Sequence, residues 1–93
     1  MSTESILNEK SIAFLESYLN NASPTGFEAE GQKIWMDYVK PYVDTFITDT
    51  YGTAVGIINP DAPYKVVIEG HADAIAWYVN YFSDDGLIYV FSN

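Results

Sequence analysis

The residues of this chain best suited to chemistry are His71 and Asp73, two positions apart in His71-Ala72-Asp73. Histidine is the commonest imidazole metal ligand, and a metal-bound imidazole usually passes its other ring proton to a carboxylate or carbonyl. Side chains two apart on an extended segment project to the same side. The pair offers both parts of such a site, one histidine ligand and an orienting aspartate, but its spacing alone is a weak signal. A surface histidine is the alternative, because such pairs also occur by chance.

The segment before this pair predicts the element that positions it. The run Val66-Val67-Ile68 is continuously apolar, which is typical of a strand buried on both faces. We expect a strand from Lys65 to Glu69. Ligand sites in open α/β sheets favour the carboxyl ends of strands, and His71 follows such an end.

Two helices are predicted before any strand. Apolar residues from Asn8 to Asn20 recur at spacings of three and four, as on one helical face. Thr25-Gly26-Phe27-Glu28 has the T-x-x-E form of a capping box, which predicts a second helix beginning there. Pro41 ends that helix after Lys40. We expect Thr25 and Glu28 to start the helix rather than to serve the site.

Beyond Pro41 the apolar period changes to two, which indicates strands. The other predicted strands are Val43 to Asp49, Thr53 to Ile58, Trp77 to Phe82 and Leu87 to Phe91. The last two are joined by Ser83-Asp84-Asp85-Gly86, with a glycine able to take positive φ, so they predict a hairpin. The acidic pair in that loop fits a turn better than a calcium site. Two helices followed by about five strands make an α+β arrangement.

Composition narrows the class of protein. A chain of 93 residues is one small domain or a piece of a larger one, and 48% hydrophobic residues with 16% aromatics argue against disorder. The net charge is −9, from 13 acidic residues against four lysines and no arginine. A basic face for phosphates or anionic lipids is therefore missing, and we expect no nucleic acid and no membrane partner.

The chain ends and the cysteine count give expectations about context. No cysteine is present, which fits a reducing compartment, and Met1-Ser2-Thr3-Glu4 does not begin a secretion signal. We expect a cytoplasmic protein. No helix follows the last strand to cover the sheet faces, so we expect the chain to be cut short. A complete α+β miniprotein is the alternative.

Two segments together resemble a known family, the co-catalytic metallo-aminopeptidases that include glutamyl aminopeptidases and tetrahedral aminopeptidases. Its members carry a loop between the first two helices whose residues are matched here by Ser23, Pro24, Gly26 and Glu28, with Thr25 in place of a serine. They also carry a strand ending in a G-H-x-D-E-I-G motif, matched by Gly70, His71, Asp73 and Ile75. The resemblance implies that the chain forms the first part of an α/β zinc-exopeptidase catalytic domain.

The resemblance also implies a function and roles for two residues. The family hydrolyses N-terminal residues from peptides with two divalent ions, zinc or cobalt. His71 resembles the histidine that ligates one metal, and Asp73 resembles the catalytic-site aspartate that orients it. Ala74 stands where the family usually has glutamate, and Ala76 where glycine or serine is usual. The family's remaining ligands and its catalytic glutamate have no counterparts here, so we expect at most partial metal binding and no activity from the isolated chain.

The family comparison further implies a division of the chain. Residues 1–75 correspond to the N-terminal part of the catalytic domain, and residues 76–93 to the first hairpin of a β-rich dimerisation domain. The exposed apolar strands of such a piece need a cover, so we expect a homo-oligomer or a complementary chain. A noncatalytic, self-associating interaction module derived from the same fold is the alternative function.

Overall fold

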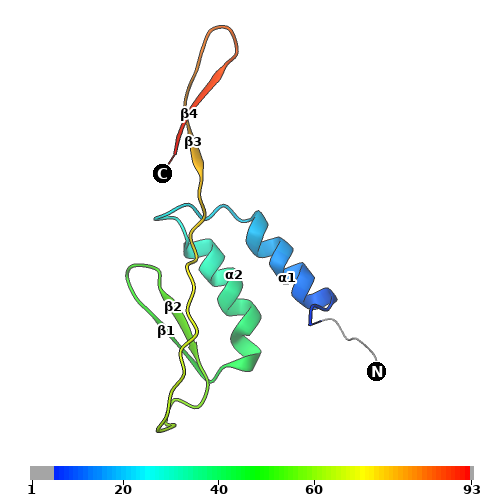
Figure 1. Cartoon of the computed structure of the whole chain (residues 1–93), viewed down its shortest axis with the longest axis vertical. Helices are drawn as coiled ribbons and strands as arrows, with labels where there is room; N and C mark the ends of the chain where they lie inside the picture. The colour runs from blue at the N-terminus through cyan, green and yellow to red at the C-terminus, as the bar shows by residue number, and fades with distance from the viewer. Residues whose placement is uncertain (1–5, 93) are drawn as a thin grey trace.

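The computed structural model describes residues 6–92 and shows two helices and four strands (Figure 1). The strands form two separate antiparallel pairs, β1–β2 and β3–β4. The predicted α+β arrangement is thus confirmed, with four paired strands in place of about five. None of the helices in the described range is long and apolar enough to cross a bilayer.

Helix α1 spans Glu9–Asn20 and begins as its sequence predicts. The Asn8 side chain is the N-cap, and its Oδ1 accepts a hydrogen bond of 2.8 Å from the Ser11 amide. This contact satisfies one of the amides that the first turn of a helix leaves unpaired. The predicted first helix is therefore confirmed to within one residue.

Helix α2 spans Ala29–Val39 and begins four residues later than predicted. Glu28 occupies the N-cap position without a side-chain bond to the helix, so the predicted capping box at Thr25 is wrong. The Glu28 carboxylate instead accepts from the Gly26 amide at 2.6 Å, inside the preceding loop. Gly26 has φ +93°, which favours glycine and carries the chain away from helical geometry. A short 3-10 turn, η1 at Lys40–Tyr42, follows the helix.

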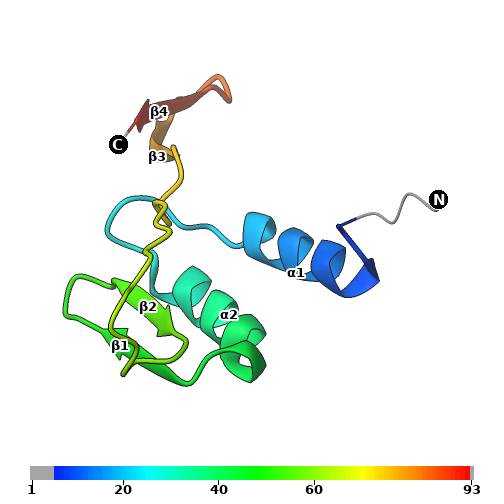
Figure 2. The ribbon, with the colours of Figure 1, turned by 60° about the horizontal axis from the view of Figure 1, so that its bottom comes forward.

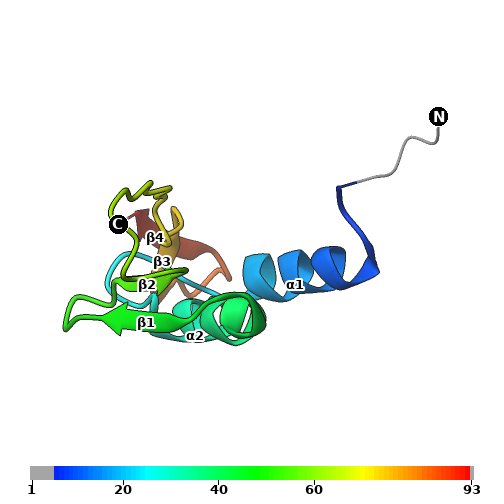
Figure 3. The same ribbon diagram turned by 90° about the horizontal axis from the view of Figure 1, so that it is seen from below.

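Helix α2 lies between α1 and the first strand pair (Figures 1 and 2). On one side Phe14 of α1 stacks on Tyr38 of α2, with ring centroids 4.1 Å apart. On the other side Trp35 meets Phe46 of β1 edge-on, at 6.4 Å. Seen from below, α1 extends away from the strand pair beyond α2 (Figure 3). Aromatic residues of α2 thus pack against α1 on one side and against β1 on the other.

The first strand pair joins β1, Thr45–Thr48, to β2, Ala54–Ile57. Its turn is organised by Asp49, whose Oδ1 accepts from the amides of Tyr51 and Thr53 at 2.9 and 3.0 Å. Both strands are shorter than the predicted ranges but lie inside them.

The predicted strand from Lys65 to Glu69 is not formed in the described part of the chain. The segment is unpaired and runs from the lower end of the molecule toward β3 (Figure 1). Val66 and Val67 are each 76% exposed and Ile68 is 96% exposed. A strand with two apolar faces needs neighbours on both edges and layers on both faces, and neither strand pair supplies them.

The second strand pair is the predicted hairpin, with β3 at Trp77–Phe82 and β4 at Ile88–Ser92. Gly86 takes φ +87° in the connecting turn, as expected. The pair projects beyond the helices as a separate arm (Figures 1 and 2).

No apolar side chain is buried among residues 6–92, so this chain has no hydrophobic core within the described range. The radius of gyration is 18.2 Å, whereas a compact chain of this length has about 12 Å. The chain is therefore extended, and the apolar faces of its elements are not buried by other residues of the described range.

Candidate functional site

The site centres on the unpaired segment that precedes β3, where His71 and Asp73 lie together as predicted. His71 Nδ1 is 2.8 Å from Asp73 Oδ1 and 2.9 Å from the Asp73 carbonyl oxygen. A neutral imidazole that donates from Nδ1 keeps its lone pair on Nε2. The His71 side chain is 85% exposed, so this second nitrogen is open to a metal ion. Metal-bound imidazoles usually show the same contact between the second ring nitrogen and a carboxylate or carbonyl oxygen.

The second oxygen of the Asp73 carboxylate is held from the loop between the two helices. Thr25 Oγ1 donates to Asp73 Oδ2 at 2.7 Å, across 48 positions of sequence. The expectation that Thr25 only starts a helix is therefore wrong. A T-x-x-E pattern looks the same whether its hydroxyl caps a helix or contacts a distant residue, so sequence reasoning missed this role. The family-like loop motif around Thr25 was the one available signal.

Backbone contacts bring the loop and the segment into register. The Ala74 amide donates to the Ser23 carbonyl oxygen at 2.7 Å, and Pro24 and Ala74 form a parallel bridge. Ser23 is 7% exposed. The two segments on which the family resemblance rests are thus in direct contact in the structure.

The contact between His71 and Asp73 shifts the pKa of both side chains. The hydrogen bonds of Asp73 with His71 raise the pKa of the imidazole above its ordinary value. The Thr25 hydroxyl and then the His71 hydrogen bond lower the pKa of the Asp73 carboxyl. Asp73 therefore stays ionised at neutral pH and keeps accepting from both neighbours.

The residues present fit one ligand of a metal site and no more. Among residues 6–92 there is no group of three or more His, Cys, Asp or Glu side chains placed to hold a metal ion. A catalytic zinc needs about three protein ligands and an open position. Ala74 stands where the resembled family usually has glutamate, so it brings no carboxylate, and its backbone amide donates to the Ser23 carbonyl oxygen.

A hollow next to the site is lined by His71 and Asp73 together with the start of α2 and the β1–β2 turn. Glu28, Gln32 and Thr53 also line it. Glu28 brings a second carboxylate to this hollow, although its nearest partner is the Gly26 amide. The hollow is therefore polar where it meets His71.

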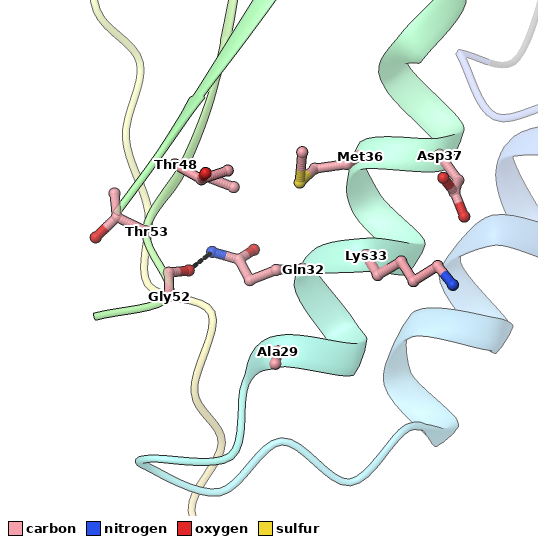
Figure 4. A pocket seen from close by; sticks show the side chains of 9 residues that line it. Ala29, Gln32, Lys33, Met36, Asp37, Thr48, Gly52 and Thr53 are labelled. Carbon is pink, nitrogen blue, oxygen red and sulfur yellow. Dashed lines mark hydrogen bonds between the residues drawn. The ribbon is translucent and has the colours of Figure 1, made fainter. Parts of the chain in front are cut away.

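A second hollow lies between α2 and the first strand pair and shares Gln32 and Thr53 with the first hollow (Figure 4). Gln32 points across it and donates to the Gly52 carbonyl oxygen at 2.8 Å, while Lys33 and Asp37 point away from the strands (Figure 4). Its lining is mostly apolar and lacks His71 and Asp73. We interpret it as a seam between packed elements.

Comparison with known proteins shows what the chain is similar to. No established family profile matches the chain. It is 27% identical over 85 residues to a protein of Thermococcus kodakarensis named as a LysW-lysine/LysW-ornithine hydrolase. The match covers 90% of this chain and 24% of that protein. The crystal structure of a TET aminopeptidase from a marine sediment archaeon, Thaumarchaeota archaeon SCGC AB-539-E09, superposes with a TM-score of 0.75 at 25% identity. That match covers 90% of this chain and 23% of the aminopeptidase. The chain thus spans about a quarter of either relative.

Proposed function

Because the chain matches a fragment of the metallo-aminopeptidase family, we propose that it contributes one metal ligand to a peptidase that removes N-terminal residues from peptides. His71 is the ligand, through Nε2, and Asp73 fixes its ring. The observation that carries the proposal is the 2.8 Å contact between His71 Nδ1 and Asp73 Oδ1 beside an exposed imidazole. Peptide substrates belong to the completed site.

The remaining ligands of that site must come from groups outside residues 6–92. When bound, a divalent ion such as zinc or cobalt supplies a water of lowered pKa as the nucleophile. The role of this chain is limited to holding the imidazole, with its Nδ1 proton directed to Asp73. Two metal ions occupy the site of the resembled family, and this chain supplies one ligand, His71, to one of them. We therefore propose that the isolated chain is inactive.

An assay of the purified chain tests the inactivity. The chain is incubated with zinc or cobalt and short peptides, and released amino acids are measured beside the matched variant His71→Ala. The proposal expects equal, background release from both proteins. Metal-dependent release by the unaltered chain that disappears in His71→Ala would overturn it, because a single histidine would then suffice.

We infer that the hairpin β3–β4 starts a unit distinct from the site-bearing part, divided near residue 76. It projects from the helices, and its residues pair only with one another in strands. In the resembled family this place is taken by a dimerisation domain, and we propose that the hairpin serves assembly here.

The alternative function, a noncatalytic interaction module, is favoured by the aromatic face of the hairpin. Tyr81 stacks on Tyr89 at 4.5 Å, and Tyr78 stacks on Phe91 at 5.4 Å. Both pairs are on one face because a register shift between Val79 and Tyr81 realigns the strand. A homo-oligomer or a complementary chain would cover this face. Self-association without any metal affinity at His71 would select this alternative.

A further inference from the structure

The contact between Thr25 and Asp73 bears on the orientation of the Asp73 carboxylate as well as joining two segments of the chain. The Asp73 carboxylate has two oxygens with different partners: Oδ1 faces His71 Nδ1, and Oδ2 accepts from Thr25 Oγ1 at 2.7 Å. The last torsion of an aspartate side chain has a broad, roughly two-fold preference, so contacts to both oxygens narrow its orientation. With Thr25 on one oxygen, the other is kept in the direction of the imidazole.

The surrounding loop keeps the Thr25 hydroxyl at this place. The Phe27 amide donates to the Pro24 carbonyl oxygen at 2.8 Å, and the Gly26 amide donates to Glu28 Oε1 at 2.6 Å. The Ala74 amide ties the loop to the site segment through Ser23. These three hydrogen bonds fix the loop that carries Thr25 beside Asp73.

From this geometry we propose that Thr25 is a positioning residue, whose hydroxyl orients the Asp73 carboxylate and thereby sets the tautomer and direction of the His71 ring. The proposal rests on the proposed role of His71 as a ligand. Thr25 acts on the imidazole through Asp73. Its effect is to keep the Nδ1 proton on the side of Asp73, so that Nε2 presents a lone pair.

Nitrogen-15 chemical shifts of the metal-free chain test this proposal, because they report which ring nitrogen carries the proton. The chain has a single histidine, so the signal is unambiguous. Above the pKa of His71, the unaltered chain is expected to hold mainly the Nδ1–H form. Thr25→Val and Thr25→Ala are expected to lower the ratio of Nδ1–H to Nε2–H by about threefold or more, since they remove a hydrogen bond to a charged group. Thr25→Ser restores the hydroxyl and should keep the ratio.

Two controls separate positioning from a general loss of structure. Thr45→Val makes the same replacement on β1, away from the site, and should leave the ratio unchanged. The Ala74 amide shift reports the contact with Ser23, and it should stay in place in every Thr25 variant. If the tautomer ratio falls in Thr25→Ala and is kept in Thr25→Ser, the hydroxyl is the cause. This comparison holds even if Thr25→Val disturbs the loop.

The outcome distinguishes this proposal from the proposed function. An unchanged tautomer ratio in Thr25→Ala with the Ala74 contact kept would overturn the positioning role, whatever the metal affinity. Loss of the Ala74 contact together with the ratio, with no rescue by Thr25→Ser, would also overturn it in favour of a purely structural role. The measurement needs neither metal nor activity, so a failure of His71 to bind zinc leaves its result readable.

Discussion

His71 Nδ1 lies 2.8 Å from Asp73 Oδ1, and the two residues project to the same side of an extended segment. The contact assigns the two ring nitrogens different tasks, since one faces the carboxylate and the other is open. This relationship is local in sequence and needs no hydrophobic core to form. It therefore forms in a chain that buries no apolar side chain in the described range.

The first prediction concerns the titration of His71. Asp73→Asn removes the negative charge and replaces the carboxylate acceptor with a weaker, neutral amide oxygen, so the pKa of the imidazole should fall toward its ordinary value. Proton NMR of the ring follows the change in the metal-free chain. Asp84→Asn, in the turn of the hairpin, removes an equal charge far from His71 and is the matched control. The same pKa in Asp73→Asn and in the unaltered chain would contradict the contact.

The signs of the two pKa shifts define the pH window of the contact. The raised pKa of His71 means that its stabilisation is fully present below about 6.5 and is lost as pH rises through the folded value. The lowered pKa of Asp73 means that its stabilisation is present above about 3.8 and is lost as pH falls through the folded value. The Ala74 amide, next to the pair, should therefore be most protected from hydrogen exchange between these limits. Protection that is flat across both limits would argue against the paired charges.

The second prediction concerns Gly31, where α2 passes close to the loop. A Cβ at this position would lie 2.7 Å from Ser23 Oγ and 3.3 Å from Asn21 Nδ2. Alanine is favoured in a helix by about 1 kcal/mol over glycine, but overpacking typically costs about 1–3 kcal/mol. Gly31→Ala should therefore lower the thermal midpoint of the helical circular dichroism signal, by a net of about 1 kcal/mol in stability.

A paired variant and a control sharpen this test. Adding Ser23→Ala removes the clashing hydroxyl and should return most of the loss. Gly70→Ala is the matched control, because no atom lies within 4 Å of the Cβ that it would add. A higher midpoint in Gly31→Ala alone would show that the helix moves freely away from the loop.

The third prediction concerns self-association through the aromatic face of the hairpin. Light scattering should give an apparent mass that rises with concentration. Tyr81→Ala removes one ring of a stacked pair and should weaken association by about tenfold, the size expected for an aromatic anchor. Tyr64→Ala removes an 83% exposed ring outside the hairpin and should have little effect. A strictly monomeric chain at all concentrations would contradict the proposed assembly role.

The parts of the fold that sequence predicted correctly depend on local signals. Asn8 begins α1 by accepting a hydrogen bond from the Ser11 amide, only three residues away. Gly86 supplies the positive φ that the turn of the hairpin requires. The pairing of His71 with Asp73 is equally local. These features follow from neighbouring residues whatever the rest of the chain does.

The parts that sequence missed depend on distant partners. A buried strand at Lys65 to Glu69 requires neighbouring strands, and the described residues provide none for it. Thr25 meets Asp73 across 48 positions, and no pattern within the loop distinguishes this contact from a helix cap. The departures at Ala74 and Ala76 are visible in sequence, but nothing in the structure explains why glutamate and a small polar or glycine residue are replaced there.

The proposed role of His71 requires Nε2 to bind a metal ion, and a zinc titration followed by nitrogen-15 NMR tests this directly. We predict that zinc shifts the Nε2 resonance, leaves Nδ1 protonated and directed to Asp73, and binds weakly because about two further ligands are missing. His71→Ala should abolish the binding. Zinc that binds at Nδ1, displacing Asp73, or that leaves the His71 ring unperturbed at saturating concentration, would contradict the account.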